Sequence, residues 1–304
     1  MHSNRKFDFA RSAHKFLLIS AIITVIGIVA TGILGLNYGI DFSAGTSMDI
    51  TSKKQIDDVK MGEFLDGEDI GSYTLTVSNS DNRASVRFKD ALTQEQEKKL
   101  KADYYAQFDP DASFEVNVVD PEIANEQQRS ALIGMAIACI GIVLYVSIRF
   151  EWRFAIAAII SLVYDAFFVI AIFSIFQLEV NLPFILAVLT IIGYSINDTV
   201  VIFDRIRENL RFAKIKTPSD YDDLVNKSIW QTLARSINTV ITVLIAAICL
   251  FIFGSVSIKL FSLAMIVGLA SGAYSSIFIA SQIWLYFKKK QPIKKIPAKA
   301  ATNP

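Results

Sequence analysis

Six long stretches of the chain consist almost entirely of apolar residues, and segments rich in polar and charged residues separate them. A transmembrane helix needs about 20 consecutive apolar residues to cross a hydrocarbon layer of ~30 Å. Helices of soluble proteins are shorter, roughly 10–14 residues, and are apolar on one face only. The pattern therefore predicts a polytopic α-helical membrane protein. The six predicted transmembrane spans are residues 16–36, 130–148, 154–178, 182–203, 236–253 and 260–287.

The first span follows several basic residues, as the core of a signal peptide does, but it is longer than the roughly 7–15 residues of such a core. We interpret it as a retained membrane anchor. Lysine and arginine gather in residues 1–15, after the second and fourth spans, and in the tail 288–304. Because these residues favour the cytoplasmic side, both termini are expected in the cytoplasm and residues 37–129 outside it. The basic tail is expected beside anionic membrane lipid.

The segment 37–129 is long enough to form a separate extracytoplasmic domain. Alternating apolar positions predict strands, three-to-four spacing predicts helices, and residues 78–82 have the composition of a hairpin turn. Thr93 and Gln96 are spaced as a helix capping box. The order βαββαβ is typical of a ferredoxin-like α+β sandwich. The predicted strands are 45–51, 72–78, 83–89 and 113–119, and the predicted helices are 53–65 and 93–108.

Charge and composition exclude several classes of protein. The formal net charge is +1 with 53% hydrophobic residues, which excludes a disordered chain and a basic nucleic-acid binder. The two cysteines both lie inside predicted spans, where we interpret them as packing residues. The sequence offers no metal-ligand spacing, nucleotide-binding loop or nucleophile–base pair, so we predict no cofactor and no enzyme. Any energy source must be ion flow or a partner protein.

Two acidic residues, Asp165 and Asp198, are the charges inside the predicted spans. A charge near the bilayer centre costs at least ~2.5–3.5 kcal/mol on insertion scales, so such residues usually face a polar interior and serve a function. At 1.5 Å per helical residue, Asp165 lies about 18 Å from the cytoplasmic end of its span, and Asp198 lies about 10 Å in from the same side. Both are therefore candidate proton-binding groups.

Polar stripes accompany Asp198 on two predicted helices. We expect Asp198 to face Arg235, which opens the fifth span, across a partly hydrated cleft. Asp198 would take up and release protons, and the permanently charged Arg235 would modulate it. The open alternatives are a static ion pair and an arginine that only marks the membrane surface. The supporting polar residues are Thr190, Tyr194 and Asn197 in the fourth span and Asn238, Thr239 and Thr242 in the fifth.

Two other acidic positions have simpler alternatives. Asp165 either relays protons or only accepts hydrogen bonds from neighbours such as Ser161. Asp204 lies beside Arg205 and Arg207 at the predicted membrane boundary, and for it we favour interfacial ion pairing.

Small residues recur every four positions in the last span, where they let another helix approach closely. The sequence leaves open whether that helix belongs to this chain or to a partner. The small residues are Ala264, Gly268, Gly272, Ser276 and Ala280, and Gly27, Thr31 and Gly35 form a similar stripe in the first span.

Two sequence motifs resemble those of a known family. The run I-G-Y-S-I-N-D-T-V-V-I-F-D-R-I-R-E-N, residues 192–209, resembles the fourth-span signature of the SecF branch of the SecD/SecF family. After the first span, Gly39, Asp41, Phe42 and Gly45 match the G-x-D-F-x-G-G-T motif of the same family. Ala44 stands where that motif has the first glycine of its pair.

The resemblance implies a function in bacterial protein export across the inner, or cytoplasmic, membrane. It implies a twelve-span assembly with SecD, of the RND-superfamily type, that promotes late preprotein translocation with the SecYEG channel and the SecA motor. It also implies coupling to the proton-motive force through Asp198 and Arg235, and Asp165 resembles a third-span aspartate of the family. At the start of the fifth span the family has the sequence R-T-L-x-T-S. This chain has R-S-I-N-T at residues 235–239 and so departs from it.

Two other functions remain as alternatives. One is an RND-type, proton-driven exporter of small molecules or lipids, which would need a second six-span chain. The other is a structural subunit that stabilises SecD and has no proton role. Co-purification of SecD and SecYEG would favour protein export over the small-molecule exporter, and their absence together with drug sensitivity would favour the exporter. Neutralisation of Asp198 without consequence would support the structural subunit.

Overall fold

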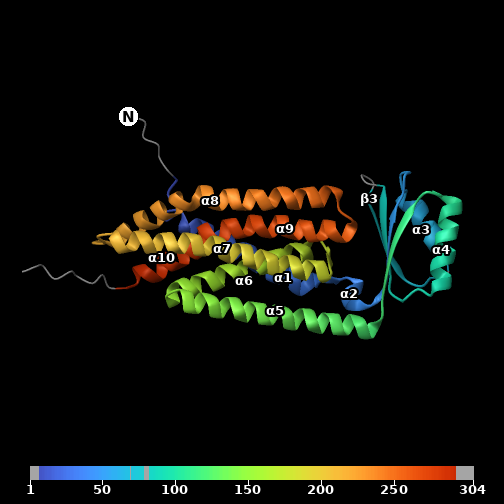
Figure 1. Cartoon of the computed structure of the whole chain (residues 1–304), viewed down its shortest axis with the longest axis horizontal. Coiled ribbons are helices and arrows are strands. Elements are labelled where there is room, and N and C mark those ends of the chain that lie inside the picture. Colours follow the sequence, from blue (N-terminus) through green and yellow to red (C-terminus); the bar gives the residue numbers. More distant parts are fainter. Residues whose placement is uncertain (1–6, 69, 79–81, 292–304) are drawn as a thin grey trace, which may run out of the picture.

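A computed structural model of the chain describes residues 7–68, 70–78 and 82–291 (Figure 1). Six helical segments among these residues are long and apolar enough to cross a membrane. They lie side by side in one bundle, and an α+β domain caps one end of it (Figure 1). The spans are α1 (Ala13–Leu34), α5 (Pro121–Arg149), α6 (Trp152–Ile175), α7 (Leu182–Phe212), α8 (Pro218–Phe253), and the continuous series α9 (Val256–Ser275), η1 (Ser276–Ala280) and α10 (Ser281–Lys289).

Several helices extend beyond the apolar stretches that predicted them. Helix α5 begins at Pro121, inside the segment 37–129 assigned to the outer domain, because proline is favoured in the first helical turn. Helix α8 begins at Pro218, well before residue 236, and Thr217 and Asp220 form a capping box there. Hydropathy marks only the part of a helix that meets hydrocarbon. A hydropathy pattern therefore does not predict the polar, capped turns by which a helix extends beyond its apolar stretch.

The outer domain has the predicted ferredoxin-like topology. Its four strands pair antiparallel in the order β3–β4–β2–β5, which is the arrangement of two interleaved βαβ units. Helix α3 begins at Asp58 rather than at residue 53, because the Asp57 side chain accepts the first free backbone N–H groups. The predicted turn residues 79–81 lie outside the described residues. The domain comprises β2 (Gly45–Thr51), α3 (Asp58–Asp66), β3 (Tyr73–Ser78), β4 (Arg83–Phe88), α4 (Gln94–Gln107) and β5 (Ser113–Val119).

One face of this sheet packs against α3 and α4, and the other faces the helix bundle (Figure 1). On β4, Ala84, Val86 and Phe88 are buried in the domain core. Because side chains alternate along a strand, Arg83 and Arg87 lie on the opposite face. The domain therefore presents two arginines to the end of the bundle.

A short connection that the sequence pattern did not predict joins the domain to the bundle. Strand β1 (Asn37–Tyr38) pairs in parallel with β6 (Glu179–Val180), which lies in the connection between α6 and α7. A single turn of helix, α2 (Ile40–Ser43), follows β1. Two-residue strands carry too little alternation for a sequence pattern to reveal.

The small-residue stripe of the last span packs against α7 of the same chain. A side chain on Gly268 would collide with Ile191, and one on Gly272 would meet Ser195. Ser276 lies in the π-helical turn η1, where its hydroxyl is 2.8 Å from the Thr199 hydroxyl. For these three residues, the neighbouring helix therefore belongs to this chain and not to a partner protein.

Candidate functional site

Asp198 lies on the buried face of α7, the helix that packs against α6, α8 and α9. The Asn181 side chain caps the helix by accepting a hydrogen bond from the backbone N–H of Phe184 at 3.0 Å. Ile191, Ser195 and Ile202 are buried on the same face as Asp198, at helical spacing. Asp198 is therefore held in the interior of the bundle by the packing of its own helix.

The Asp198 carboxylate is buried and incompletely satisfied. The residue is 8% exposed, and its Oδ2 atom has no hydrogen-bond partner in the described part of the chain. The buried hydroxyl of Ser236 in α8 also lacks one, and Ser236 and Arg235 are the neighbours whose dipole and charge act on the carboxylate. An unsatisfied buried carboxylate costs free energy when it is charged, so this group is suited to changing its protonation state.

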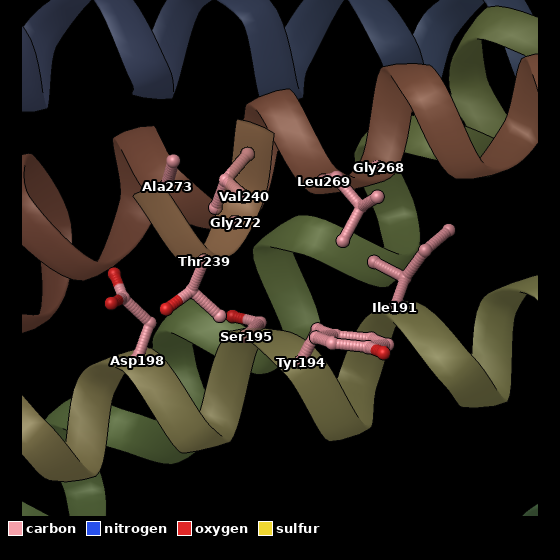
Figure 2. A pocket seen from close by; sticks show the side chains of 10 residues that line it. All are labelled: Ile191, Tyr194, Ser195, Asp198, Thr239, Val240, Gly268, Leu269, Gly272 and Ala273. Atoms are coloured by element: carbon pink, nitrogen blue, oxygen red, sulfur yellow. The ribbon is translucent and has the colours of Figure 1, made fainter. Parts of the chain in front are cut away.

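A small cavity adjoins Asp198 between α7, α8 and α9. Its volume of about 10 Å³ is close to what one water molecule needs. Figure 2 shows Asp198, Ser195 and Thr239 around this space, with Gly272 from α9 opposite. The glycine matters because a larger residue there would fill the space beside Ser195.

Asp165, on α6, lies at the centre of a second polar cluster. It is fully buried and accepts hydrogen bonds from three serine hydroxyls. Ser195 of α7 donates at 2.5 Å, Ser271 of α9 at 2.7 Å and Ser275 of α9 at 2.6 Å. The cluster therefore joins three spans through one carboxylate.

The expected neighbour of Asp165, Ser161, does not bond it. The Ser161 hydroxyl is buried and has no hydrogen-bond partner among the residues that the structure describes. The partners come from other helices, which a single-helix pattern could not identify. Ser271 and Ser275 were missed because they lie beside the glycines of the last span, where small residues indicate packing.

Ser195 links the two aspartates. Its hydroxyl bonds Asp165, and it lines the cavity beside Asp198, one helical turn away on α7. Ser195 therefore bonds one carboxylate and borders the cavity beside the other. No basic side chain is hydrogen-bonded to Asp165 in the ranges described.

Arg235 lies on an exposed part of α8. No hydrogen bond or ion pair within residues 7–68, 70–78 and 82–291 joins it to Asp198. Thr239 is half-buried, and its hydroxyl donates to the Arg235 carbonyl at 2.9 Å.

The other predicted polar residues lie mostly on the outer surface of the bundle. Tyr194 is 38% exposed, and Asn197 and Asn238 are exposed as well. Arg235, on the neighbouring helix α8, is exposed too.

Asp204 forms ion pairs near the end of the bundle remote from the outer domain. It lies 3.2 Å from the guanidinium of Arg149, at the end of α5, and 2.9 Å from that of Arg207, one turn along α7. This agrees with the ion pairing expected from sequence.

The residues of the motif after the first span have distinct structural roles. Asp41 Oδ2 accepts the backbone N–H of Leu182, the first residue of α7, at 2.8 Å. Phe42 is buried among apolar residues of the bundle. Gly45 has φ +117°, and a Cβ there would collide with the carbonyl of Phe88. Gly39 donates its N–H to the carbonyl of Val180 at 2.8 Å.

Together, the fold and site define a class: multi-pass membrane proteins with acidic residues buried in the bundle and an α+β domain at one end. Comparison with known families narrows this class. Residues 100–290 match the family "Protein export membrane protein SecD/SecF, C-terminal", and residues 29–56 match the "SecD/SecF GG Motif". The chain therefore belongs to the SecD/SecF family of protein-export membrane proteins.

Relatives indicate its place within the family. The chain is 43% identical to the protein translocase subunit SecF of Alicyclobacillus acidocaldarius, over 94% of both chains. It is 44% identical to the translocase subunit SecDF of Bacillus subtilis over 94% of its own length, and covers 39% of that longer chain.

Solved structures show the same relation. A crystal structure of SecDF from Thermus thermophilus, described as a translocon-associated membrane protein, matches with a TM-score of 0.84 and 30% identity. A super-membrane-facing form of SecDF matches with a TM-score of 0.61 and 29% identity. The matches cover 95% and 94% of this chain, respectively, and 39% of each of the longer SecDF chains. It is thus similar in sequence and fold to the SecF portion of these proteins.

Proposed function

We propose that this chain promotes late preprotein translocation by using the proton-motive force, with Asp198 as its principal proton-binding group. The observation that carries the proposal is the buried Asp198 carboxylate. One of its oxygens has no hydrogen-bond partner among the residues that the structure describes, and it adjoins a cavity the size of one water molecule. Its charged form is costly there, and a bound proton removes that cost. Proton binding would therefore change which arrangement of α7, α8 and α9 is most stable.

Asp165 and Arg235 have supporting roles in this proposal. Asp165 holds α6, α7 and α9 together through its three serine bonds, and Ser195 links it to the Asp198 cavity. Arg235 supplies a permanent positive charge halfway along α8, which balances Asp198 when the proton leaves. One elementary charge that crosses 100 mV releases ~2.3 kcal/mol, enough to bias two arrangements of the bundle.

We further propose SecD as the membrane partner. The relatives named SecDF join a segment similar to this chain to a longer protein. The exposed polar residues Tyr194, Asn197 and Asn238 support the same partnership. Polar groups that face lipid are costly, whereas polar groups that face another helix bundle can be satisfied.

The proposed topology has both termini in the cytoplasm of a bacterial cell, with the α+β domain outside the inner membrane. The asymmetry of lysine and arginine supports it. The outer domain and α10 lie at opposite ends of the bundle (Figure 1). The N-terminal residues near α1 also belong to the α10 end, since Ala10 donates to Asn226 of α8. The remaining proposed partners are the SecYEG channel, SecA and an unfolded preprotein emerging outside.

The decisive experiment measures export into vesicles that contain the full assembly, with and without a proton gradient. We expect Asp198→Asn and Arg235→Met each to abolish the stimulation by the gradient while the assembly still forms, because each removes a charge from the site. Asp204→Asn is the matched control: it makes the same chemical change on the same helix, at a carboxylate paired with Arg149. It should keep most of the stimulation.

Normal stimulation by Asp198→Asn vesicles would rule out the proton role and leave a structural subunit. Recovery of the chain without SecD or SecYEG, together with increased sensitivity of mutant cells to small toxic compounds, would favour an RND-type exporter.

A further inference from the structure

The outer domain contacts the loops at the nearer ends of both helices that carry the proposed proton site. Arg83 and Arg87 lie on the face of β4 that is directed toward the bundle. They are separated by Ser85 and share this face because side chains alternate along a strand. Each arginine contacts a different loop at the outer end of the bundle.

Arg87 is tied to the start of α7. Its guanidinium forms an ion pair with Glu179 of β6, in the loop that leads into α7. The two side chains are only 21% and 19% exposed. A partly buried pair of this kind is less screened by solvent than a surface pair.

Backbone contacts around the Arg87–Glu179 ion pair strengthen this connection to the loop before α7. Strand β1 pairs with β6, and Gly39 donates to the Val180 carbonyl at 2.8 Å. Any side chain on Gly39 would collide with Glu179. Asp41 accepts the N–H of Leu182 at 2.8 Å, where its negative charge also suits the positive end of the helix dipole.

Arg83 is tied to the end of α8. Its Nη1 donates to the carbonyl of Gly254 at 2.5 Å, and Gly254 is the residue that ends α8. Helix α8 carries Arg235, and helix α7 carries Asp198. Asp198 lies 16 residues beyond Leu182 (198 minus 182), about 24 Å along a rigid helix.

We propose that Arg83 and Arg87 transmit movement between the proton site and the outer domain. One strand holds the outer ends of both α7 and α8, so an axial shift of one helix against the other would tilt the whole sheet. These are positioning residues that act at a distance from Asp198. The inference rests on the proposed proton role of Asp198.

Charge reversal of the Arg87–Glu179 pair tests this in the full assembly. We expect Arg87→Glu and Glu179→Arg each to lower gradient-stimulated export about tenfold, and the double reversal to restore it to within about twofold, as for interacting residues. Export without a gradient should be unchanged. Lys53→Glu is the matched control, since it reverses a charge in the exposed Lys53–Asp111 pair within the outer domain.

A second measurement reads the movement itself. Spin labels on the outer domain and on the bundle should report two distance populations whose ratio follows the gradient. In Arg87→Glu that ratio should no longer follow it. Glu179→Gln disrupts the ion pair with Arg87 more mildly. Arg83→Met removes the hydrogen bond to the Gly254 carbonyl while keeping an unbranched side chain.

Asp198→Asn, measured in parallel, separates the two proposals. If it retains full stimulation, the proton role fails, whatever the arginine variants do. If Asp198→Asn abolishes the stimulation while Arg87→Glu, Glu179→Gln and Arg83→Met all retain it, the proposal that Arg83 and Arg87 transmit movement is overturned. Loss in both single reversals without rescue in the double reversal would also overturn it.

Discussion

At the scale of single residues, two buried aspartates of one bundle differ in how they are satisfied. Asp165 has three serine donors, whereas one oxygen of Asp198 has no hydrogen-bond partner among the described residues. The sequence marked both as candidates because a charge in an apolar span is costly. It favoured Asp198 over Asp165, but it could not show how each carboxylate is satisfied, since the serines that bond Asp165 come from two other helices.

Ala44 offers a test of backbone strain at this scale. It has φ +63° and ψ 172°, a conformation that is essentially restricted to glycine, and it stands where the family motif has glycine. Relief of the strain is worth about 1–3 kcal/mol, and the extra freedom of glycine in the unfolded chain costs about 0.5–1 kcal/mol. We therefore expect Ala44→Gly to stabilise the outer domain by about 1 kcal/mol in chemical unfolding followed by the circular dichroism of the sheet.

Ala91→Gly is the control for this change. Ala91 lies in an exposed loop and is not among the non-glycine residues with positive φ. It should gain no stability. An unchanged or lowered unfolding midpoint for Ala44→Gly would show that the turn relaxes in solution.

At the scale of secondary-structure elements, close packing of α7 and α9 brings the site residues together. The glycines of α9 let α7 approach until Ser195 reaches both Asp165 and the Asp198 cavity. The spacing of small residues predicted a packing surface, and residues of α7 lie against Gly268 and Gly272. Its position next to the site became visible only when the partner helix was identified.

Gly268→Val should therefore destabilise the bundle. The added side chain would collide with Ile191, and overpacking of this kind costs about 1–3 kcal/mol. Thermal unfolding in detergent should show a lowered midpoint. Gly141→Val on α5 is the control, because nothing lies within 4 Å of a Cβ at that position. Equal midpoints for the two variants would show that the α7–α9 contact is loose.

At the scale of the whole molecule, two neighbouring helices of the bundle carry exposed polar side chains within their apolar spans. Tyr194 and Asn197 on α7 and Asn238 and Arg235 on α8 are exposed. Apolar residues that face outward need only lipid, as on α1 and α5. A polar surface needs a partner, so the chain is expected to be one half of a larger bundle.

Replacement of these polar groups should weaken assembly. We expect the double variant Asn197→Leu with Asn238→Leu to reduce the SecD recovered by co-purification by about threefold or more, given ~0.6–1.7 kcal/mol for a hydrogen bond between transmembrane helices. Ser147→Leu, at an exposed position of α5, is the control and should recover SecD normally. Full recovery of SecD by the double variant would show that the partner binds elsewhere.

The amino-acid sequence by itself determined the number of spans, the strand and helix order of the outer domain, and the charged residues to examine. These features depend on local periodicity and on the high cost of charge in hydrocarbon, both of which can be evaluated along the chain. The tertiary structure decided what lies next to what. It gave Asp165 its serine partners, joined Arg235 to Asp198 by no hydrogen bond or ion pair in the described part of the chain, and connected Arg83 and Arg87 to the loops beside two helix ends. Such contacts join residues far apart in sequence, so no local pattern contains them.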